Sequence, residues 1–440
     1  MTETVDLLQV MIRNACVNDG SQESGGEVRN ADVIQSFLDG SGLDFQRFEA
    51  LPDRPSLVGR MEGSDPKAPT LLLMGHTDVV PVNPDGWQRD PFGAELVDGE
   101  IWGRGAVDML NLTSSMAVAI RNVAASGFKP KGTLIYFAVP DEEAAGTYGA
   151  KYMCENETDA IRADYVVTEM GGFQFAGAGT PQRIVTVGEK GTYWCRITVR
   201  GTPGHGSMPA RTDNALVKAA EVVRRLAEYR PPTTLHDVWR DFVEKMEFPP
   251  ELSATLLDAK KVDELVETSP DVGLARMVHA CTHTTFAPTV LAAGVKANVI
   301  PDHAELQVDI RTLPGQSGDD IQAMLRDALG DYYDGVEIDP MSAMPASFST
   351  IETPLYETMS RVTERLSPGS KTVPFMITGA TDARFFRKLG AVSYGYGLFS
   401  ERIPFTEFAR MFHGDNERID VESLRLSTEL WEALIREFLG

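Results

Sequence analysis

Short apolar runs that alternate with segments of helical periodicity constrain the fold of this chain more than any other feature of its sequence. Four runs have the length and apolar character of strands: 56–62, 70–75, 132–139 and 164–170. Helices are expected over 1–19, 27–40, 108–126 and from about Tyr148 onward. Because strands that alternate with helices form a largely parallel sheet, the sequence predicts an α/β fold.

The pattern changes near residue 187. The elements expected there are strand, helix, strand, strand, helix and strand, over 192–201, 213–228, 288–294, 304–312, 317–330 and 335–340. This βαββαβ order is that of the ferredoxin-like split unit. A polar excursion over 231–284 lies inside the unit and is not assigned. After about residue 345 the first pattern resumes, with strands at 371–377 and 391–397 and a helix at 421–438.

Acidic residues and histidines stand where predicted strands end or beside glycine turns. They are His76, Asp78, Asp108, Glu142, Glu143, Glu169 and His413. Ligands of parallel sheets sit at the carboxyl ends of the strands, so these side chains are expected to meet. Nitrogen and oxygen ligands of this kind suit a pair of divalent ions, and a carboxylate left over beside them suits metal-assisted hydrolysis.

Each motif also has an ordinary interpretation when taken alone. An isolated His-x-Asp is weak evidence, and two adjacent glutamates are common on solvated surfaces. Glu169 could simply end a strand, and His413 could belong to a capping cluster. The combination favours a functional site, because independent surface residues would not all fall at strand ends around glycine turns.

The spacing within the motifs indicates a division of roles. In an extended chain His76 and Asp78 share a face, so one can bind metal while the other fixes the imidazole. Asp108 follows a glycine-rich turn and can bridge two ions. Glu142 and Glu143 cannot point the same way from an extended backbone, which favours one as a ligand and the other as a general base.

We predict that the flanks of the chain form one domain around an insertion. A chain of 440 residues is long for a single hydrophobic core, and His413 lies on the segment that resumes the first pattern. Both flanks must therefore meet at one metal site. The prediction is a catalytic α/β domain from 1–186 and 346–440, with an inserted ferredoxin-like domain at 187–345.

The charge balance limits the partners. Lys and Arg number 41 against 64 Asp and Glu, which gives a net charge of −23. Such acidity disfavours nucleic acid and anionic membranes. We expect no signal peptide, because no basic segment followed by an apolar run opens the chain, and no transmembrane helix. Four widely spaced cysteines form no C-x-x-C pair, which favours reduced thiols and a cytoplasmic location.

The motifs, taken in order, carry a resemblance that covers nearly the whole chain. They are GHTDVVP, the segment from Trp87 to Phe92, GRGAVDM, DEEAAG, TEMGG and HGDNE. This set resembles the dinuclear zinc aminoacylase and carboxypeptidase metallopeptidase family, which includes aminoacylase-1, carboxypeptidase G, acetylornithine deacetylase and succinyl-diaminopimelate desuccinylase. The resemblance implies a catalytic α/β domain split by a ferredoxin-like dimerisation domain, and hence a homodimer.

The resemblance also implies two zinc ions per chain and a role for each motif. The implied ligands are His76 and Glu169 for the first ion, Glu143 and His413 for the second, and Asp108 as the bridge. Asp78 would orient His76, and Glu142 would deprotonate the bridging water and pass the proton to the leaving amine. Co²⁺ or Mn²⁺ would suit the same ligands.

Further residues would bind the substrate. His205, in GTPGHGSMP, would reach the partner subunit's site and stabilise the oxyanion. Asn298 and Arg311 would grip the substrate carboxylate, which Arg suits by its bidentate geometry, and Gly379 would contact the same group through its backbone. In the ordinary interpretation Arg311 is a strand-end charge and Gly379 a turn residue.

Two positions depart from the family pattern. Leu110 stands where the family usually has a lysine after Asp108 and Met109, which changes the local electrostatics but removes no metal ligand. Ala380 stands where some deacylases carry a hydroxyl residue, which disfavours the desuccinylase interpretation. The excursion at 231–284 favours a broader-substrate peptidase or acylase.

The leading hypothesis is a zinc-dependent hydrolase that cleaves the amide bond of N-acyl amino acids or small peptides, next to a free carboxylate. One alternative is a biosynthetic deacylase of acetylornithine or succinyl-diaminopimelate type. An alternative of a different class is a catalytically silent binding or scaffold protein with the same fold.

Overall fold

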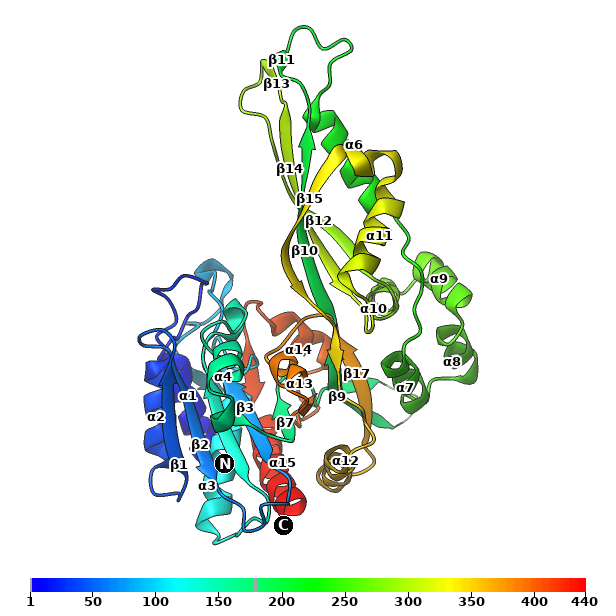
Figure 1. The fold of residues 1–440 in the computed structure, drawn as a ribbon. Coiled ribbons are helices and arrows are strands. Elements are labelled where there is room, and N and C mark those ends of the chain that lie inside the picture. Colours follow the sequence, from blue (N-terminus) through cyan, green and yellow to red (C-terminus); the bar gives the residue numbers. More distant parts are fainter. Residues whose placement is uncertain (1, 177–179) are drawn as a thin grey trace.

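A ten-stranded sheet forms the centre of the larger part of this computed structural model, which describes residues 2–176 and 180–440 (Figure 1). The main strand order is β1-β2-β6-β3-β7-β18-β9-β16, and β8 and β17 each pair with β9. The strands are β1 (Asp44–Glu49), β2 (Pro55–Met61), β3 (Leu71–His76), β6 (Leu134–Val139), β7 (Tyr165–Thr168), β8 (Gln174–Ala176), β9 (Pro181–Glu189), β16 (Ser347–Phe348), β17 (Lys371–Ile377) and β18 (Val392–Gly395).

The middle of the sheet is parallel. Strand β3 pairs in parallel with both β6 and β7, and β7 pairs in parallel with β18. Strands β3 and β6 are buried along their whole length, as expected for apolar runs covered on both faces. The carboxyl ends of these strands therefore lie at one edge of the sheet. The predicted α/β fold with a mostly parallel central sheet is confirmed.

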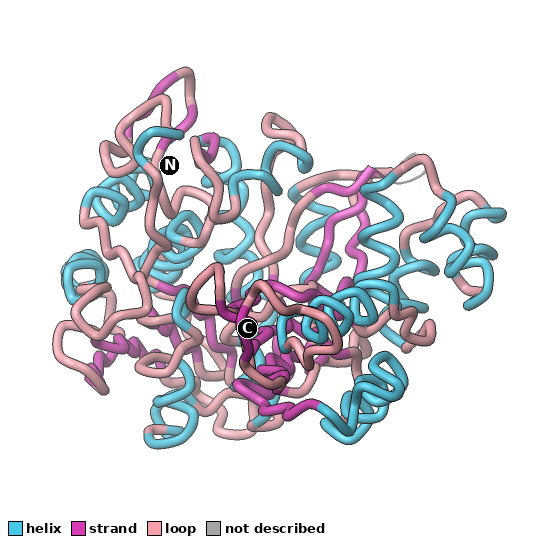
Figure 2. The backbone as a smooth tube through the Cα atoms, turned by 90° about the horizontal axis from the view of Figure 1, so that it is seen from above, coloured by secondary structure: helices cyan, strands magenta, loops and turns pink. Residues whose placement is uncertain are grey.

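Helices cover both faces of the sheet (Figure 2). One face carries α1 (Thr2–Arg13), α2 (Val28–Leu38), α3 (Leu110–Ala125), α12 (Pro354–Leu366) and α15 (Val421–Leu439). The other carries α4 (Ala150–Asn156), α5 (Thr158–Ile161) and α13 (Ala383–Lys388). The Trp431 indole on α15 donates to Ser115 Oγ on α3 at 3.0 Å, so the end of the chain packs onto its first half.

A second, four-stranded antiparallel sheet stands away from the first (Figure 1). Its elements are β10 (Gly191–Arg200), α6 (Ala215–Glu228), β12 (Thr285–Ala293), β14 (His303–Thr312), α11 (Gly318–Leu329) and β15 (Val336–Met344). The order β12-β14-β10-β15 is that of the split βαββαβ unit. Burial alternates strictly along β14, because only one sheet face packs against α6 and α11. The domain boundaries and the dimerisation role remain predictions.

The excursion at 231–284 consists of four helices. They are α7 (Asp237–Lys245), α8 (Pro250–Leu256), α9 (Ala259–Thr268) and α10 (Val272–Thr282). Trp239 and Phe242 of α7 share a buried cluster with Ile184 of β9 and Val373 of β17. Although the segment falls within the inserted stretch of sequence, its core is shared with the large sheet.

Small elements surround the strand ends. A three-stranded sheet has the order β19-β5-β4, from β19 (Arg418–Asp420), β5 (Glu100–Trp102) and β4 (Glu95–Val97). A two-stranded ribbon, β11 (Gly204–His205) and β13 (Val299–Ile300), lies at the far tip of the second sheet, and α14 (Phe405–Met411) precedes His413 (Figure 1). Within the described ranges no helix has the length and apolarity to cross a bilayer.

Two boundaries differ from the prediction. The helix expected over 1–19 ends at Arg13, because Ala15 adopts a positive φ of 48° and Val17 bridges to Val79 beside β3. The large sheet also extends past residue 187, since β9 continues to Glu189 and is followed almost directly by β10. A strand was expected over 192–201 but none over 181–189, so β9 was missed.

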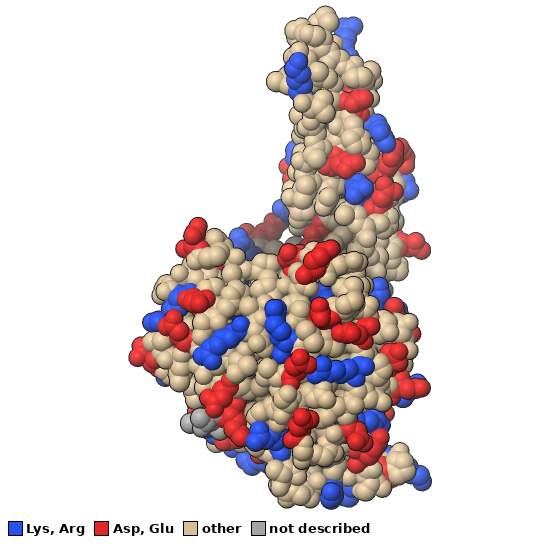
Figure 3. Space-filling model, turned by 90° about the vertical axis from the view of Figure 1, so that its left-hand side faces the viewer, with Lys and Arg blue, Asp and Glu red and all other residues tan. Residues whose placement is uncertain are grey.

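On the face shown in Figure 3, Lys and Arg side chains are interspersed with Asp and Glu over the larger part of the molecule. The charges therefore mix on this face rather than separate into regions of one sign.

Candidate metal centre

The predicted ligands converge at the carboxyl edge of the parallel strands. His76 is the last residue of β3, and Glu169 directly follows β7. Glu142 and Glu143 open a short 3-10 turn, Glu142–Ala144, just after β6. Asp108 lies in the loop before α3, and His413 follows α14.

Asp108 joins these side chains into two groups of possible metal ligands. One group is His76, Asp108 and Glu169, and the other is Asp108, Glu143 and His413. Asp108 Oδ1 lies 3.2 Å from His76 Nε2, whereas its Oδ2 lies 3.3 Å from His413 Nε2. The two oxygens thus face different histidines, which is the arrangement that a bridging carboxylate needs.

Each group has one further carboxylate close to its histidine. Glu169 Oε2 lies 3.9 Å from His76 Nε2, and Glu143 Oε2 lies 3.1 Å from His413 Nε2. Glu143 Oε1 is buried and has no hydrogen-bond partner among the described residues. A buried oxygen left without a partner is unfavourable unless a cation or a ligand meets it. The donor set therefore fits two divalent ions such as zinc.

The electrostatics of the site agree with this fit. Burial, and then the charge of Glu142, raises the pKa of Glu169 well above its usual value. Burial also disfavours ionisation of Asp108, but the hydrogen bonds from His413 and His76 outweigh it and hold the pKa of Asp108 below its usual range. Hydrogen bonds to Asp108 and Glu143 raise the pKa of His413 to about 10. The pKa of Glu169 thus stays raised although His76 lowers it, and a bound cation would favour the ionised carboxylate.

Asp78 holds the turn that carries the two glutamates. Its carboxylate accepts from the backbone N–H groups of Glu142 at 3.3 Å and Glu143 at 3.1 Å. The closest contact of His76 Nδ1 is the backbone carbonyl of Asp78 at 3.0 Å, and the carboxylate lies farther away at 3.6 Å. The side chain of Asp78 therefore places the Glu142–Glu143 turn as much as it orients the imidazole.

Glu142 has the surroundings expected of a general base, because it lies beside both groups of possible ligands but belongs to neither. Burial, and then the charge of Asp382, raises the pKa of Glu142 well above its usual value. Asp382 packs against the same turn, because a Cβ built at Gly146 would lie 2.5 Å from its Oδ1. The 3-10 turn, rather than the extended backbone expected from the sequence, separates Glu142 from its neighbour.

Two residues of the site were not identified from the sequence. Glu417, in the same HGDNE motif as His413, accepts from the backbone N–H of Val107 at 2.6 Å and of Asp108 at 3.0 Å. It also pairs with Arg104 at 2.9 Å, in a fully buried setting. Asn18 donates to Asp78 Oδ2 at 2.9 Å. Glu417 was detectable as the last acidic residue of the motif, whereas no sequence signal marked Asn18.

Within one chain, two of the predicted substrate-binding residues, His205 and Asn298, lie far from Arg311. His205 and Asn298 lie together at the far tip of the inserted sheet, where Gly206 N donates to the Asn298 carbonyl at 2.8 Å (Figure 1). Arg311 lies at the opposite end of that sheet, and Gly379 is exposed on the loop after β17, with open space around it.

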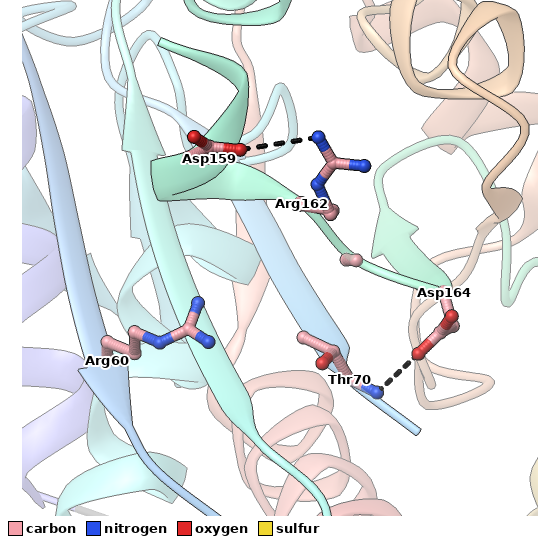
Figure 4. A pocket seen from close by; sticks show the side chains of 6 residues that line it. Arg60, Thr70, Asp159, Arg162 and Asp164 are labelled. Carbon is pink, nitrogen blue, oxygen red and sulfur yellow. Dashed lines mark hydrogen bonds and ion pairs between the residues drawn. The ribbon is translucent and has the colours of Figure 1, made fainter. Parts of the chain in front are cut away.

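A hollow of about 260 Å³ lies elsewhere on the large domain (Figure 4). It is lined by Arg60, Thr70, Asp159, Arg162, Ala163 and Asp164. Asp164 accepts from Thr70 N just before β7 and β3 begin, so this hollow faces the amino ends of the parallel strands. It is not part of the metal centre.

Comparison with known proteins identifies the family. A model of the peptidase family M20/M25/M40 matches residues 72–437, which include every predicted metal ligand. The chain belongs to peptidase family M20/M25/M40. An M20 metallo-carboxypeptidase, Sso-CP2 from Sulfolobus solfataricus, has a similar fold, with a TM-score of 0.73 at 17% identity over 100% of this chain and 99% of that one.

Two relatives of the M20 chain indicate its chemical class. The N-fatty-acyl-amino acid synthase/hydrolase PM20D1 of Xenopus tropicalis is 29% identical over 395 residues, covering 86% of this chain and 74% of that protein. Aminoacylase-1 of Mus musculus is 25% identical over 401 residues, covering 90% and 86%. The M20 protein is therefore an enzyme of the amidohydrolase and peptidase kind.

Proposed function

We propose that this M20 enzyme is a dinuclear zinc amidohydrolase that releases an amino acid from N-acyl amino acids or small peptides. The observation that carries the proposal is Asp108, which presents one oxygen to each of two histidine-carboxylate groups. The relatives named for N-fatty-acyl amino acids and for aminoacylase activity favour the N-acyl substrates.

The protein's own residues would divide the work. Bound zinc ions polarise an amide carbonyl and acidify a water molecule. Glu142 would take the proton of the attacking water and return it to the nitrogen of the leaving amine. Arg311 and the backbone of Gly379 would hold the substrate carboxylate, which fixes the scissile bond relative to Glu142.

We infer that the active form is a homodimer. The edge strand β12 exposes Val290 and Leu291, and the start of α6 exposes Leu216 and Val217. An unpaired edge beside exposed apolar side chains can pair with a second copy of the chain. His205 and Asn298, at the tip of the same unit, would then reach the partner's metal centre.

Mixing two inactive variants tests this arrangement. His205→Ala and Glu142→Ala proteins should each be nearly inactive as homodimers. After subunit exchange, activity should recover to about a quarter of wild type, because about half the dimers are mixed and each holds one complete site. If labelled subunits show that exchange has occurred but activity does not recover, His205 acts within its own chain. If sedimentation shows a monomer, the dimer is excluded.

The first experiment on the function itself combines metal content with substrate turnover. Zinc per chain is measured by mass spectrometry, and amine release is followed over N-acyl amino acids, dipeptides, N-acetylornithine and N-succinyl-diaminopimelate. About two zinc per chain and chelator-sensitive release from N-acyl amino acids or dipeptides are expected. Release only from the two biosynthetic substrates would favour the deacylase alternative. Failure to take up zinc after reconstitution would favour a silent protein.

A cytoplasmic location is also a proposal. Cys16, Cys154, Cys195 and Cys281 are all buried and unpaired, which fits a reducing compartment.

A further inference from the structure

The two sheets are joined at a junction built around two adjacent buried ionisable side chains. Strand β9 ends at Glu189 and β10 begins at Gly191, so the chain passes from the large sheet to the inserted sheet through Lys190. The return crossing lies beside it, because Ser347 of β16 pairs with Glu189. Both side chains are almost completely buried, with 1% of Glu189 and 2% of Lys190 exposed.

The carboxylate of Glu189 is bound on both of its oxygens. Arg387 Nη1, on α13, lies 2.5 Å from Oε1, and the backbone N–H of Thr381 donates to Oε2 at 2.5 Å. Arg387 also donates through Nη2 to the carbonyl of Ser393 at 2.9 Å. Glu189 thus ties the end of β9 both to α13 and to the loop that precedes it.

Lys190 points to the other side of the junction. Its Nζ donates to the carbonyl of Ala280 at 2.8 Å and of His283 at 2.7 Å, at the carboxyl end of α10. The backbone N–H of Lys190 donates to the carbonyl of Ile377, the last residue of β17, at 3.1 Å. Side-chain and backbone contacts together fix this stretch of chain against β17 and the helical excursion.

The loop that Glu189 holds reaches the predicted carboxylate subsite. Gly379 lies two residues before Thr381, on the exposed part of the loop, and Asp382 follows Thr381 and packs against the turn of Glu142. A shift of Thr381 would therefore displace Gly379 relative to the metal centre.

The second predicted carboxylate-binding residue is fixed to the same strand. Arg311 of β14 pairs in register with Thr192, which lies three residues beyond Glu189. The guanidinium of Arg311 donates to Asp309 through Nε at 2.8 Å and through Nη2 at 3.2 Å, and Asp309 also accepts from the Trp194 indole at 2.9 Å. Arg311 is thus held in place from β10, the continuation of β9.

We propose that Glu189 is a positioning residue for the substrate carboxylate. It fixes the loop of Gly379 to the end of β9, and β9 continues into β10, the strand that pairs with Arg311. This rests on the proposed function, in which Gly379 and Arg311 bind that carboxylate. Glu189 is buried and acts through Thr381 and Arg387, so it is not itself a catalytic residue. Its replacement should weaken recognition of the free carboxylate more than it affects the chemical step.

The test compares Glu189→Gln with wild type on an N-acetyl amino acid and on the corresponding amide, which lacks the carboxylate. Glutamine keeps the size of the side chain but exchanges one acceptor for a donor, so Thr381 or Arg387 loses its partner. We expect KM for the N-acetyl amino acid to rise about 10-fold, the size of one charge-assisted hydrogen bond, with kcat and the KM for the amide little changed. Glu221→Gln, which loses contacts to two arginines on α6, is the matched control and should change neither constant.

A second variant guards against a general loss of stability. Glu189→Gln leaves a buried arginine without its carboxylate, whereas Glu189→Gln with Arg387→Met removes both charges and should restore the melting temperature. The KM effect on the carboxylate substrate should persist in the double variant. Equal losses on both substrates, or full rescue of KM by the double variant, would overturn the proposal.

The same comparison separates this proposal from the proposed function. A wild-type enzyme that hydrolyses neither substrate would contradict the function. Calorimetric titration of the N-acetyl amino acid and of its amide into the zinc-loaded proteins would then decide the positioning role without turnover. Tighter binding of the acid than of the amide in wild type, lost in Glu189→Gln, supports it. If Glu189→Gln prefers the acid over the amide by the same factor as wild type, the positioning role is overturned.

Discussion

Glu142→Ala is expected to remove nearly all hydrolysis while both metal ions remain bound. Glu142 stands outside both groups of possible ligands but shares the 3-10 turn with Glu143, which belongs to one of them. General base catalysis contributes about 10²–10⁴-fold to rate, so kcat should fall by that factor, with a much smaller change in KM. Steady-state kinetics on an N-acyl amino acid and zinc content by mass spectrometry measure the two effects together.

The variant needs two controls. Glu142→Gln keeps the shape of the side chain but cannot accept a proton, and its loss of kcat should match that of Glu142→Ala. Glu155→Ala removes an exposed carboxylate from α4 and should leave the kinetics unchanged. Full activity in Glu142→Ala would exclude the proposed base, and loss of zinc along with activity would make Glu142 a ligand instead.

Asp108→Ala should remove both ions rather than one. Its two oxygens face different histidines, so the substitution takes one ligand from each group. Zinc content after dialysis should fall from about two per chain towards zero, with activity at background. Glu169→Ala and Glu143→Ala each alter a single group and should retain about one ion.

Thermal unfolding measures the loss of zinc binding in Asp108→Ala by a second method. Ligands that bind only the folded state stabilise it, by about 2.7 kcal/mol when they are present at 100 times their Kd. Added zinc should therefore raise the melting temperature of wild type but not that of Asp108→Ala. Asp159→Ala, which removes a fully exposed carboxylate on the far hollow, should respond as wild type does. Zinc content unchanged in Asp108→Ala would exclude the bridging role.

The sequence predicted which acidic residues and histidines would lie together at the candidate metal centre. His76, Glu142, Glu143 and Glu169 could be placed together because each lies at or just after the end of a strand of one parallel sheet, and such strands end at a common edge. Glu417 and Asn18 escaped prediction because they act on backbone N–H groups and on another carboxylate. Such contacts depend on loop conformation, which leaves no periodic pattern.

The two sheets of the fold were also predictable from the sequence. Alternating strands and helices predicted the parallel sheet, and the βαββαβ order predicted the second sheet. The four helices of 231–284 could not be placed, because their apolar side chains pack in one cluster with Ile184 and Val373, which are distant in the sequence. Only the family resemblance implied that His205 acts away from the metal centre of its own chain, since the separation depends on the length of β10 and β14 beyond the junction.

The shared ligand has a consequence for the order in which the centre can form during synthesis. Asp108, His76 and Glu169 leave the ribosome early, whereas His413 and Glu417 emerge only after the whole inserted unit has been made. The nascent chain can thus present a complete ligand group for one ion long before the second exists. Glu417, which holds the backbone of Val107 and Asp108, arrives last. The contacts that hold the backbone of Asp108 can therefore form only after the whole inserted unit has been synthesised.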